Sequence, residues 1–248
     1  ESDVIWILYN HLSGKEITPY PHDSPRGMEA ALKKAGHVLN RDLSVHENFE
    51  IFQFSLMRQG FLKQKPVLKT GLMYLGDLKP YQNIDPELVP FILEHVRSPK
   101  FLHILRHPFE VVSSSMSFGG GTGGDIWHGK GPRDIMKMWE LHERHVIEAT
   151  EKYNLDILTV RYDRLIGDTV HEMERVFRFL EVGYSESLLE TCRQNTLPNF
   201  KKIRPYPTTA TQRELMRRYD LQTDFNWFDR RLLPAFRKYF HKLKLKLV

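Results

Sequence analysis

The sequence FLHILRHPFEVVSSSMSF (residues 101–118) joins an apolar run to the start of a helix. The run reads as a buried strand that ends at Arg106. Pro108 suits the first turn of the following helix, because the N–H that proline lacks has no partner there. Helical periodicity then resumes and carries Ser114, eight residues after Arg106. The strand would deliver Arg106 to the carboxyl edge of a sheet, where ligands of open α/β sheets bind.

This junction has the chemistry of an anion site. The start of a helix offers free N–H groups and a partial positive charge. Arg106 adds a planar fork of donors suited to phosphate oxygens. The hydroxyl of Ser114 reaches the same anion if the helix packs close to the strand. The alternative is a plain strand–helix junction with an exposed arginine and ordinary helix serines.

Two further apolar runs favour a parallel sheet. Residues 66–70 and 155–162, like 100–106, read as buried strands, and each is followed by helical periodicity. Such βα alternation is typical of a parallel sheet covered by helices on both faces. We therefore predict a three-layer α/β/α domain in which these strands lie parallel. The expected helices cover residues 2–13, 47–61, 85–97, 109–118, 133–153, 168–180 and 228–246.

The composition indicates one folded domain spanning residues 1–248. Hydrophobic residues make up 41% of the chain and charged residues 27%, which is typical of a globular protein. No stretch approaches the ~20 apolar residues that a membrane span needs. Residues 119–132 are rich in glycine and read as a mobile loop, whereas residues 228–248 read as a basic amphipathic helix.

Charge and cysteine content narrow the partners and the compartment. The single cysteine, Cys192, excludes an intramolecular disulfide and a cysteine-based zinc cluster, and suits the reducing cytoplasm. A net charge of +5 favours acidic partners such as a nucleotide, a sulfated ligand or an acidic protein. We expect no nucleic-acid partner, because no known binding module is present.

The junction at Arg106 resembles a known family motif. Sulfotransferases that use 3′-phosphoadenosine 5′-phosphosulfate (PAPS) bind the 3′-phosphate with R-D-P-R-D-V-x-x-S, and this chain matches it in register at Arg106, Pro108, Val111 and Ser114. The chain departs from the motif at His107, Phe109 and Glu110. R-H-P occurs in some bacterial members, including domains built into polyketide synthases. The resemblance implies that Arg106 and Ser114 hold the 3′-phosphate.

Two more stretches carry the resemblance. Residues 157–182 resemble the family's strand, Y-E-D-L and amphipathic helix, with Tyr162 at the tyrosine that lies near the adenine; the alternative for Tyr162 is a core residue at a strand end. The stretch KPVLKTGLMYL (65–75) resembles the strand before the substrate pocket and gives Lys69 and Thr70 the matching positions. Gly71 stands where cytosolic members keep a catalytic histidine, which leaves the general base unassigned.

The resemblance implies a P-loop-NTPase-like sulfotransferase fold with one part missing. The family's first strand and its glycine-containing phosphosulfate loop are not found. Gly14 and Lys15 do not have the P-loop spacing. We expect a chain that begins just after this loop, with residues 3–12 forming the helix that follows it.

The implied activity is sulfuryl transfer from PAPS to an alcohol, either a small molecule or one bound to an acidic carrier protein. The catalytic base would be a histidine or glutamate. The candidates lie before or on predicted helices: His46, Glu47, Glu50, Glu140, His142, Glu143 and His145. We expect no metal, because H-E-R-H (142–145) is short of the H-E-x-x-H zinc signature.

Two other functions fit less of the sequence. The first is a non-catalytic relic of the same fold that keeps only a nucleotide or anion site. The second is a small-molecule kinase of the wider P-loop class. A kinase needs a magnesium-binding carboxylate at a strand end, and the sequence offers no clear candidate.

Overall fold

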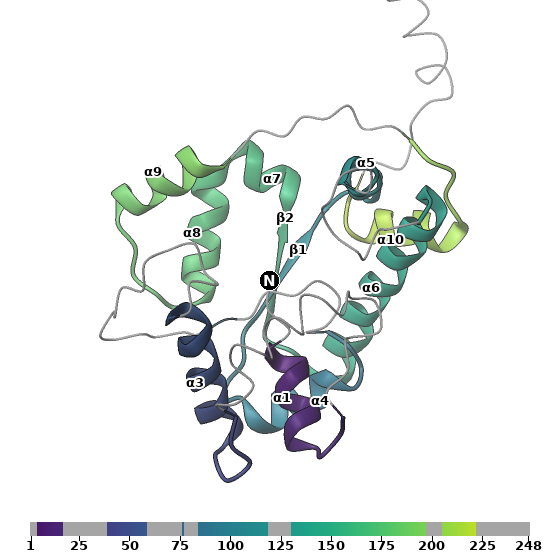
Figure 1. Ribbon diagram of the computed structural model, residues 1–248. Helices are drawn as coiled ribbons and strands as arrows, with labels where there is room; N and C mark the ends of the chain where they lie inside the picture. The colour runs from purple at the N-terminus through teal and green to yellow at the C-terminus, as the bar shows by residue number, and fades with distance from the viewer. Residues whose placement is uncertain are drawn as a thin grey trace, which may run out of the picture.

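The computed structural model describes residues 4–16, 39–58, 76, 84–118, 130–196 and 205–221. Its elements are drawn in Figure 1. Along the chain they are α1 (Val4–Leu12), α3 (Val45–Arg58), α4 (Leu88–His95), β1 (Phe101–Leu105), α5 (Pro108–Phe118), α6 (Pro132–Tyr153), β2 (Ile157–Arg161), α7 (Tyr162–Gly167), α8 (Thr169–Phe179), α9 (Glu186–Asn195) and α10 (Ala210–Arg218).

The strands β1 and β2 pair in parallel. Phe101 lies opposite Ile157, and Leu105 lies opposite Arg161. Helices stand on both sides of this pair, with α8 and α9 on one side and α6 and α10 on the other (Figure 1). The three-layer α/β arrangement and the parallel pairing of 100–106 with 155–162 are thus confirmed. The third predicted strand, 66–70, lies outside the described residues.

A hydrophobic cluster joins β1 to the helices that carry the site. Leu105 is buried at the end of β1 and packs with Phe109 and Val112 of α5. Ile135, Met136 and Trp139 of α6 complete this cluster together with Leu215 and Met216 of α10. Because apolar burial stabilises by about 25 cal/mol per Å², this cluster fixes α5 against the end of the strand.

The element ends differ from the predicted ones for identifiable reasons. Pro132 begins α6, and the Asp134 carboxylate accepts a hydrogen bond from the Gly131 N–H at 3.1 Å. Gly131 and Pro132 are therefore a helix start, and the predicted loop 119–132 is too long at that end. Asn154 ends α6 in the left-handed conformation, with φ of 49°. Residues 119–129 and the predicted helix 228–246 lie outside the described part of the chain.

No helix among the described residues is long and apolar enough to cross a membrane.

Arg161, the last residue of β2, forms hydrogen bonds with two neighbouring segments. Its Nη2 donates to Asp163 Oδ2 at 2.6 Å, and its Nη1 donates to the Asp220 carbonyl at 2.8 Å and to Asp220 Oδ2 at 3.2 Å. These contacts tie β2 to the start of α7 and to the turn after α10. The hydrogen bond from Arg161 lowers the pKa of Asp163.

We expect the contact between Arg161 and Asp163, called the Arg161 clamp below, to weaken in acid. A folded-state pKa below the unfolded value, about 3.9 for Asp, means that the stabilisation is fully present above pH 4 and is lost as the pH falls through the folded pKa. The effect should be below about 1 kcal/mol, because the Asp163 carboxylate is half exposed. Urea unfolding at pH 7 and pH 3 should show a smaller loss in Asp163→Asn than in wild type. The exposed Asp42→Asn is the control, and equal losses in Asp163→Asn and wild type would contradict the role of the clamp.

Candidate functional site

Arg106 lies at the carboxyl end of β1, directly after the last strand residue. Tyr162 lies directly after β2, where it begins α7 rather than ending the strand as predicted. Because the two strands are parallel and adjacent, their ends meet at one edge of the sheet. The guanidinium carbon of Arg106 is 4.5 Å from the centre of the Tyr162 ring, within the range of a cation–π contact. The structure thus brings together the two residues expected at the nucleotide.

Glu110 holds the Arg106 side chain from the other direction. Arg106 Nε donates to Glu110 Oε2 at 3.3 Å, one helical turn into α5. Among the described residues, the two terminal nitrogens of Arg106 have no hydrogen-bond partner, and its side chain is 23% exposed. Glu110 and Tyr162 therefore orient the guanidinium and leave its two terminal nitrogens, its outer fork, available to an anion.

The start of α5 does not offer the free N–H groups that the sequence suggested. The Phe109 N–H donates to the side-chain Nδ1 of His107 at 3.2 Å. The Glu110 and Val111 N–H groups donate to the carbonyl of His107 at 2.9 and 3.1 Å. Since Pro108 has no N–H, His107 takes up the donors of the first turn. The expectation of backbone donors to an anion is wrong here, and side chains must supply the binding.

Ser114 lies one turn beyond Glu110 on the same face of α5, because residues four apart on a helix are neighbours. Ser114 is half-buried, and its hydroxyl makes no hydrogen bond to another described residue. The structure places Ser114 on the Arg106 side of α5 without a direct contact between them. Lys69 and Thr70 lie outside the described residues.

The candidate bases on α3 are not brought to Arg106. His46 and Glu50 form an exposed ion pair at 3.4 Å. Glu47 accepts hydrogen bonds from the N–H and the hydroxyl of Ser44, which lower the pKa of Glu47. Ser44 and Glu47 thus cap the start of α3. In Figure 1, α3 lies toward the opposite end of the strands from α5.

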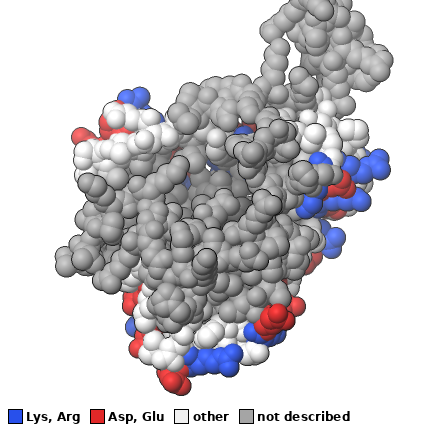
Figure 2. All heavy atoms as spheres, viewed as in Figure 1, with Lys and Arg blue, Asp and Glu red and all other residues white. Residues whose placement is uncertain are grey.

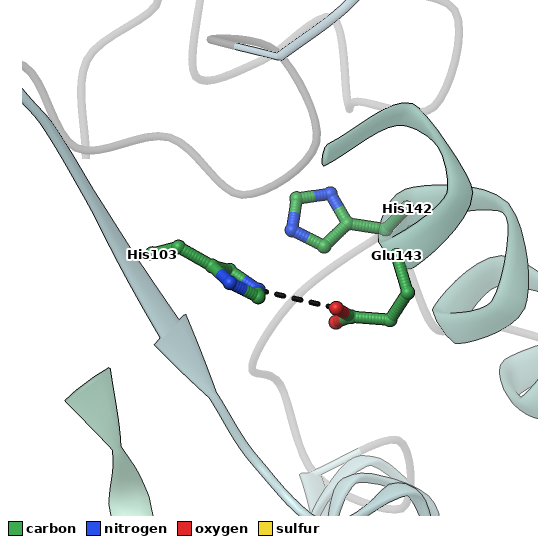
Figure 3. A group of neighbouring side chains, drawn as sticks. All are labelled: His103, His142 and Glu143. Carbon is green, nitrogen blue, oxygen red and sulfur yellow. Dashed lines mark ion pairs between the residues drawn. The ribbon is translucent and has the colours of Figure 1, made fainter. Parts of the chain in front are cut away.

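Among the candidates on α6, Glu143 is buried and His142 is half-buried. Both lie in one group with the buried His103 of β1 (Figure 3). Burial lowers the pKa of His142 to about 4, so its ring is neutral at pH 7 and is a weak base. Glu140 and His145 are half-buried on the same helix. Among the described residues, none of these four side chains pairs with Arg106 or Tyr162.

His103 is the residue in this group that is not among the candidates predicted from the sequence. The signal was present, because His103 stands between apolar residues and, like Leu105, points to the buried face of β1. A histidine at an inward position of a strand needs a polar partner. That partner, Glu143, is forty residues away in the sequence, so the strand alone could not identify it.

A family model described as the sulfotransferase family matches residues 21–186. The chain belongs to this family. The match spans two thirds of the sequence and includes Arg106, Ser114 and Tyr162. The sulfotransferase family and the transferase class are therefore confirmed.

A solved structure is similar in fold. It is the sulfotransferase domain from the curacin biosynthetic pathway, with a TM-score of 0.50 and 14% sequence identity. The alignment covers 90% of this sulfotransferase and 94% of that domain. A comparison with curated proteins gives no match. The structural likeness supports the α/β sulfotransferase fold.

We expect Glu110→Gln to tighten the binding of adenosine 3′,5′-bisphosphate by about two- to five-fold. The glutamine carbonyl still accepts from Arg106 Nε, while a negative charge beside the bound phosphate is removed. Charge pairs that are not fully buried interact by roughly 0.2–1 kcal/mol, which sets this range. Isothermal titration calorimetry measures the change, with Glu148→Gln on α6 as the control. Weaker binding by Glu110→Gln would show that the carboxylate charge is needed to orient Arg106.

Proposed function

We propose that this sulfotransferase moves a sulfuryl group from PAPS to an alcohol. The observation that supports the proposal most strongly is the position of Arg106, oriented by Glu110 and Tyr162 at the carboxyl ends of adjacent parallel strands. The family resemblance assigns the 3′-phosphate to Arg106 and Ser114 and the adenine to Tyr162. The outer fork of Arg106 has donors suited to phosphate oxygens.

The reaction needs placement of its groups more than covalent chemistry from the protein. The acceptor oxygen forms a bond to sulfur while the bond from sulfur to the 5′-phosphate oxygen breaks. The products are a sulfate ester, adenosine 3′,5′-bisphosphate and a proton taken up by a base. In-line placement and positive charge near the leaving oxygens lower the barrier, as in phosphoryl transfer. Arg106, Ser114 and Tyr162 would anchor the donor without reacting.

A transfer assay tests this proposal. The chain is incubated with PAPS and a panel of primary and secondary alcohols, and release of adenosine 3′,5′-bisphosphate is followed together with the sulfated product. Acceptor-dependent release that is lost in Arg106→Ala would support the enzyme. Tight binding of adenosine 3′,5′-bisphosphate without turnover on any alcohol would favour the non-catalytic nucleotide-binding relic.

The acceptor would be a free alcohol or one bound to an acidic carrier protein, in the cytoplasm. The net charge of +5 favours an acidic partner. Among the described residues on the face in Figure 2, however, basic and acidic side chains lie next to each other. Exposed ion pairs of the described residues include Arg144–Glu148 and Arg218–Glu151. The carrier proposal therefore depends on the basic segment 228–248 of the sequence, outside the described part.

A further inference from the structure

A second polar cluster lies within the fold, apart from the contacts of Arg106. It contains His103 of β1 with His142 and Glu143 of α6, drawn in Figure 3. One ligand-type atom from each residue lies within 4.8 Å of the others. The side chains of His103 and Glu143 are only 4% and 3% exposed. Burying a carboxylate to this extent is costly unless a cation or several donors compensate for it.

The contact between His103 and Glu143 is short but is not a well-formed hydrogen bond. His103 Nε2 and Glu143 Oε2 are 3.2 Å apart, yet neither atom meets hydrogen-bond geometry with a described residue, although the Tyr219 phenol also lies beside the Glu143 carboxylate. The ring nitrogen therefore points beside the oxygen rather than at it. Two ligands of one tetrahedral zinc ion, each about 2.0–2.1 Å from the metal, are separated by roughly 3.3 Å and point at a shared centre. The observed pair has that separation.

The surroundings of His103 also fit a metal ligand. Its Nδ1 lies 3.2 Å from the hydroxyl of Thr159, which is its register partner on β2. A metal bound at Nε2 would fix the tautomer in which Nδ1–H donates to this hydroxyl. Ligating histidines are commonly oriented by such a second hydrogen bond.

We propose that His103, His142 and Glu143 form a binding site for a divalent transition metal, with zinc as the best match to two imidazoles and one carboxylate. The ion would link β1 to α6 in the middle of the fold, with a fourth position for water. From the sequence we expect no metal, because H-E-R-H lacks the zinc spacing, but the third ligand of this proposed site comes from a distant strand. This site is separate from sulfuryl transfer and does not depend on the proposed function.

The test uses the full chain, freed of metal by a chelator and then titrated with Zn²⁺. We expect one ion per chain and a higher midpoint of thermal unfolding with zinc than with chelator. His103→Gln and Glu143→Gln should lose this binding, whereas His145→Gln on the same helix should keep it. Thr159→Val should weaken the affinity by about 10–100-fold, the range for a residue that orients a metal ligand.

Two results would overturn the proposal. One is an equal unfolding midpoint with zinc and with chelator. The other is zinc binding that persists in both His103→Gln and Glu143→Gln, since this places the ion elsewhere among the histidines. If those variants do not fold, Co²⁺ added to the wild type decides. An intense visible spectrum of tetrahedral Co²⁺ supports the site, and the weak spectrum of octahedral Co²⁺ contradicts it.

Discussion

Replacing Arg106 with alanine is expected to weaken the binding of adenosine 3′,5′-bisphosphate by about 1.5–3 kcal/mol, the range for a hydrogen bond to a charged group. This corresponds to roughly a 10–150-fold higher Kd. The effect should be large because His107 uses the backbone donors at the start of α5, so no helix N–H replaces the lost guanidinium. The variant also leaves the Glu110 carboxylate without its partner, which adds repulsion toward the phosphate.

Isothermal titration calorimetry at fixed salt measures this change. Arg144→Ala on α6 is the matched control, because it removes an exposed arginine that also pairs with a glutamate four residues on. Arg106→Lys keeps the charge but loses the planar fork, so we expect an intermediate affinity. Equal binding by wild type and Arg106→Ala would remove Arg106 from the nucleotide site.

Tyr162 allows a second check on the same site. Tyr162→Phe keeps the aromatic face over Arg106, whereas Tyr162→Leu removes it. We therefore expect the leucine variant to bind adenosine 3′,5′-bisphosphate more weakly than the phenylalanine variant.

The strands and their relation were predictable from the sequence because each is a short apolar run followed by helical periodicity. The runs 100–106 and 155–162 became β1 and β2 with one or two residues trimmed at the ends. The meeting of Arg106 and Tyr162 follows from the same pattern, since the carboxyl ends of adjacent parallel strands share an edge. This part of the site needed no information beyond the order of elements and the family resemblance.

The rest of the site depends on contacts that the sequence does not contain. His107 caps α5 with its own ring, a choice of rotamer that the letters R-H-P do not determine. His103 meets Glu143 because the buried face of β1 packs against α6 in one register. The amphipathic helix expected within residues 157–182, which is α8, shows the same limit. Glu172 is buried on that helix in an ion pair with Arg175 at 2.6 Å, while Val170 and Met173 are only half-buried.

Phe109 links the stability of the fold to the site, and Phe109→Ala should lower the free energy of unfolding by about 3–5 kcal/mol. Phe109 is 2% exposed and stands in the first turn of α5, where the family motif often has arginine. It packs in the cluster with Leu105, Ile135 and Met136, and its ring lies 6.0 Å from that of Tyr206. Truncation leaves a cavity that close-packed neighbours fill only in part.

Urea unfolding followed by circular dichroism measures this loss. Met116→Ala is the control, since Met116 lies on the same helix but is exposed, and it should change stability by less than about 0.5 kcal/mol. Phe109→Leu should fall between the two variants, because leucine fills more of the cavity than alanine does. A loss below 1 kcal/mol in Phe109→Ala would contradict the packing of α5 against β1 and α6.

Because α5 carries Glu110 and Ser114, the alanine variant should also bind adenosine 3′,5′-bisphosphate more weakly while it is still folded. Unchanged binding would mean that Arg106 and Tyr162 hold the nucleotide without support from α5.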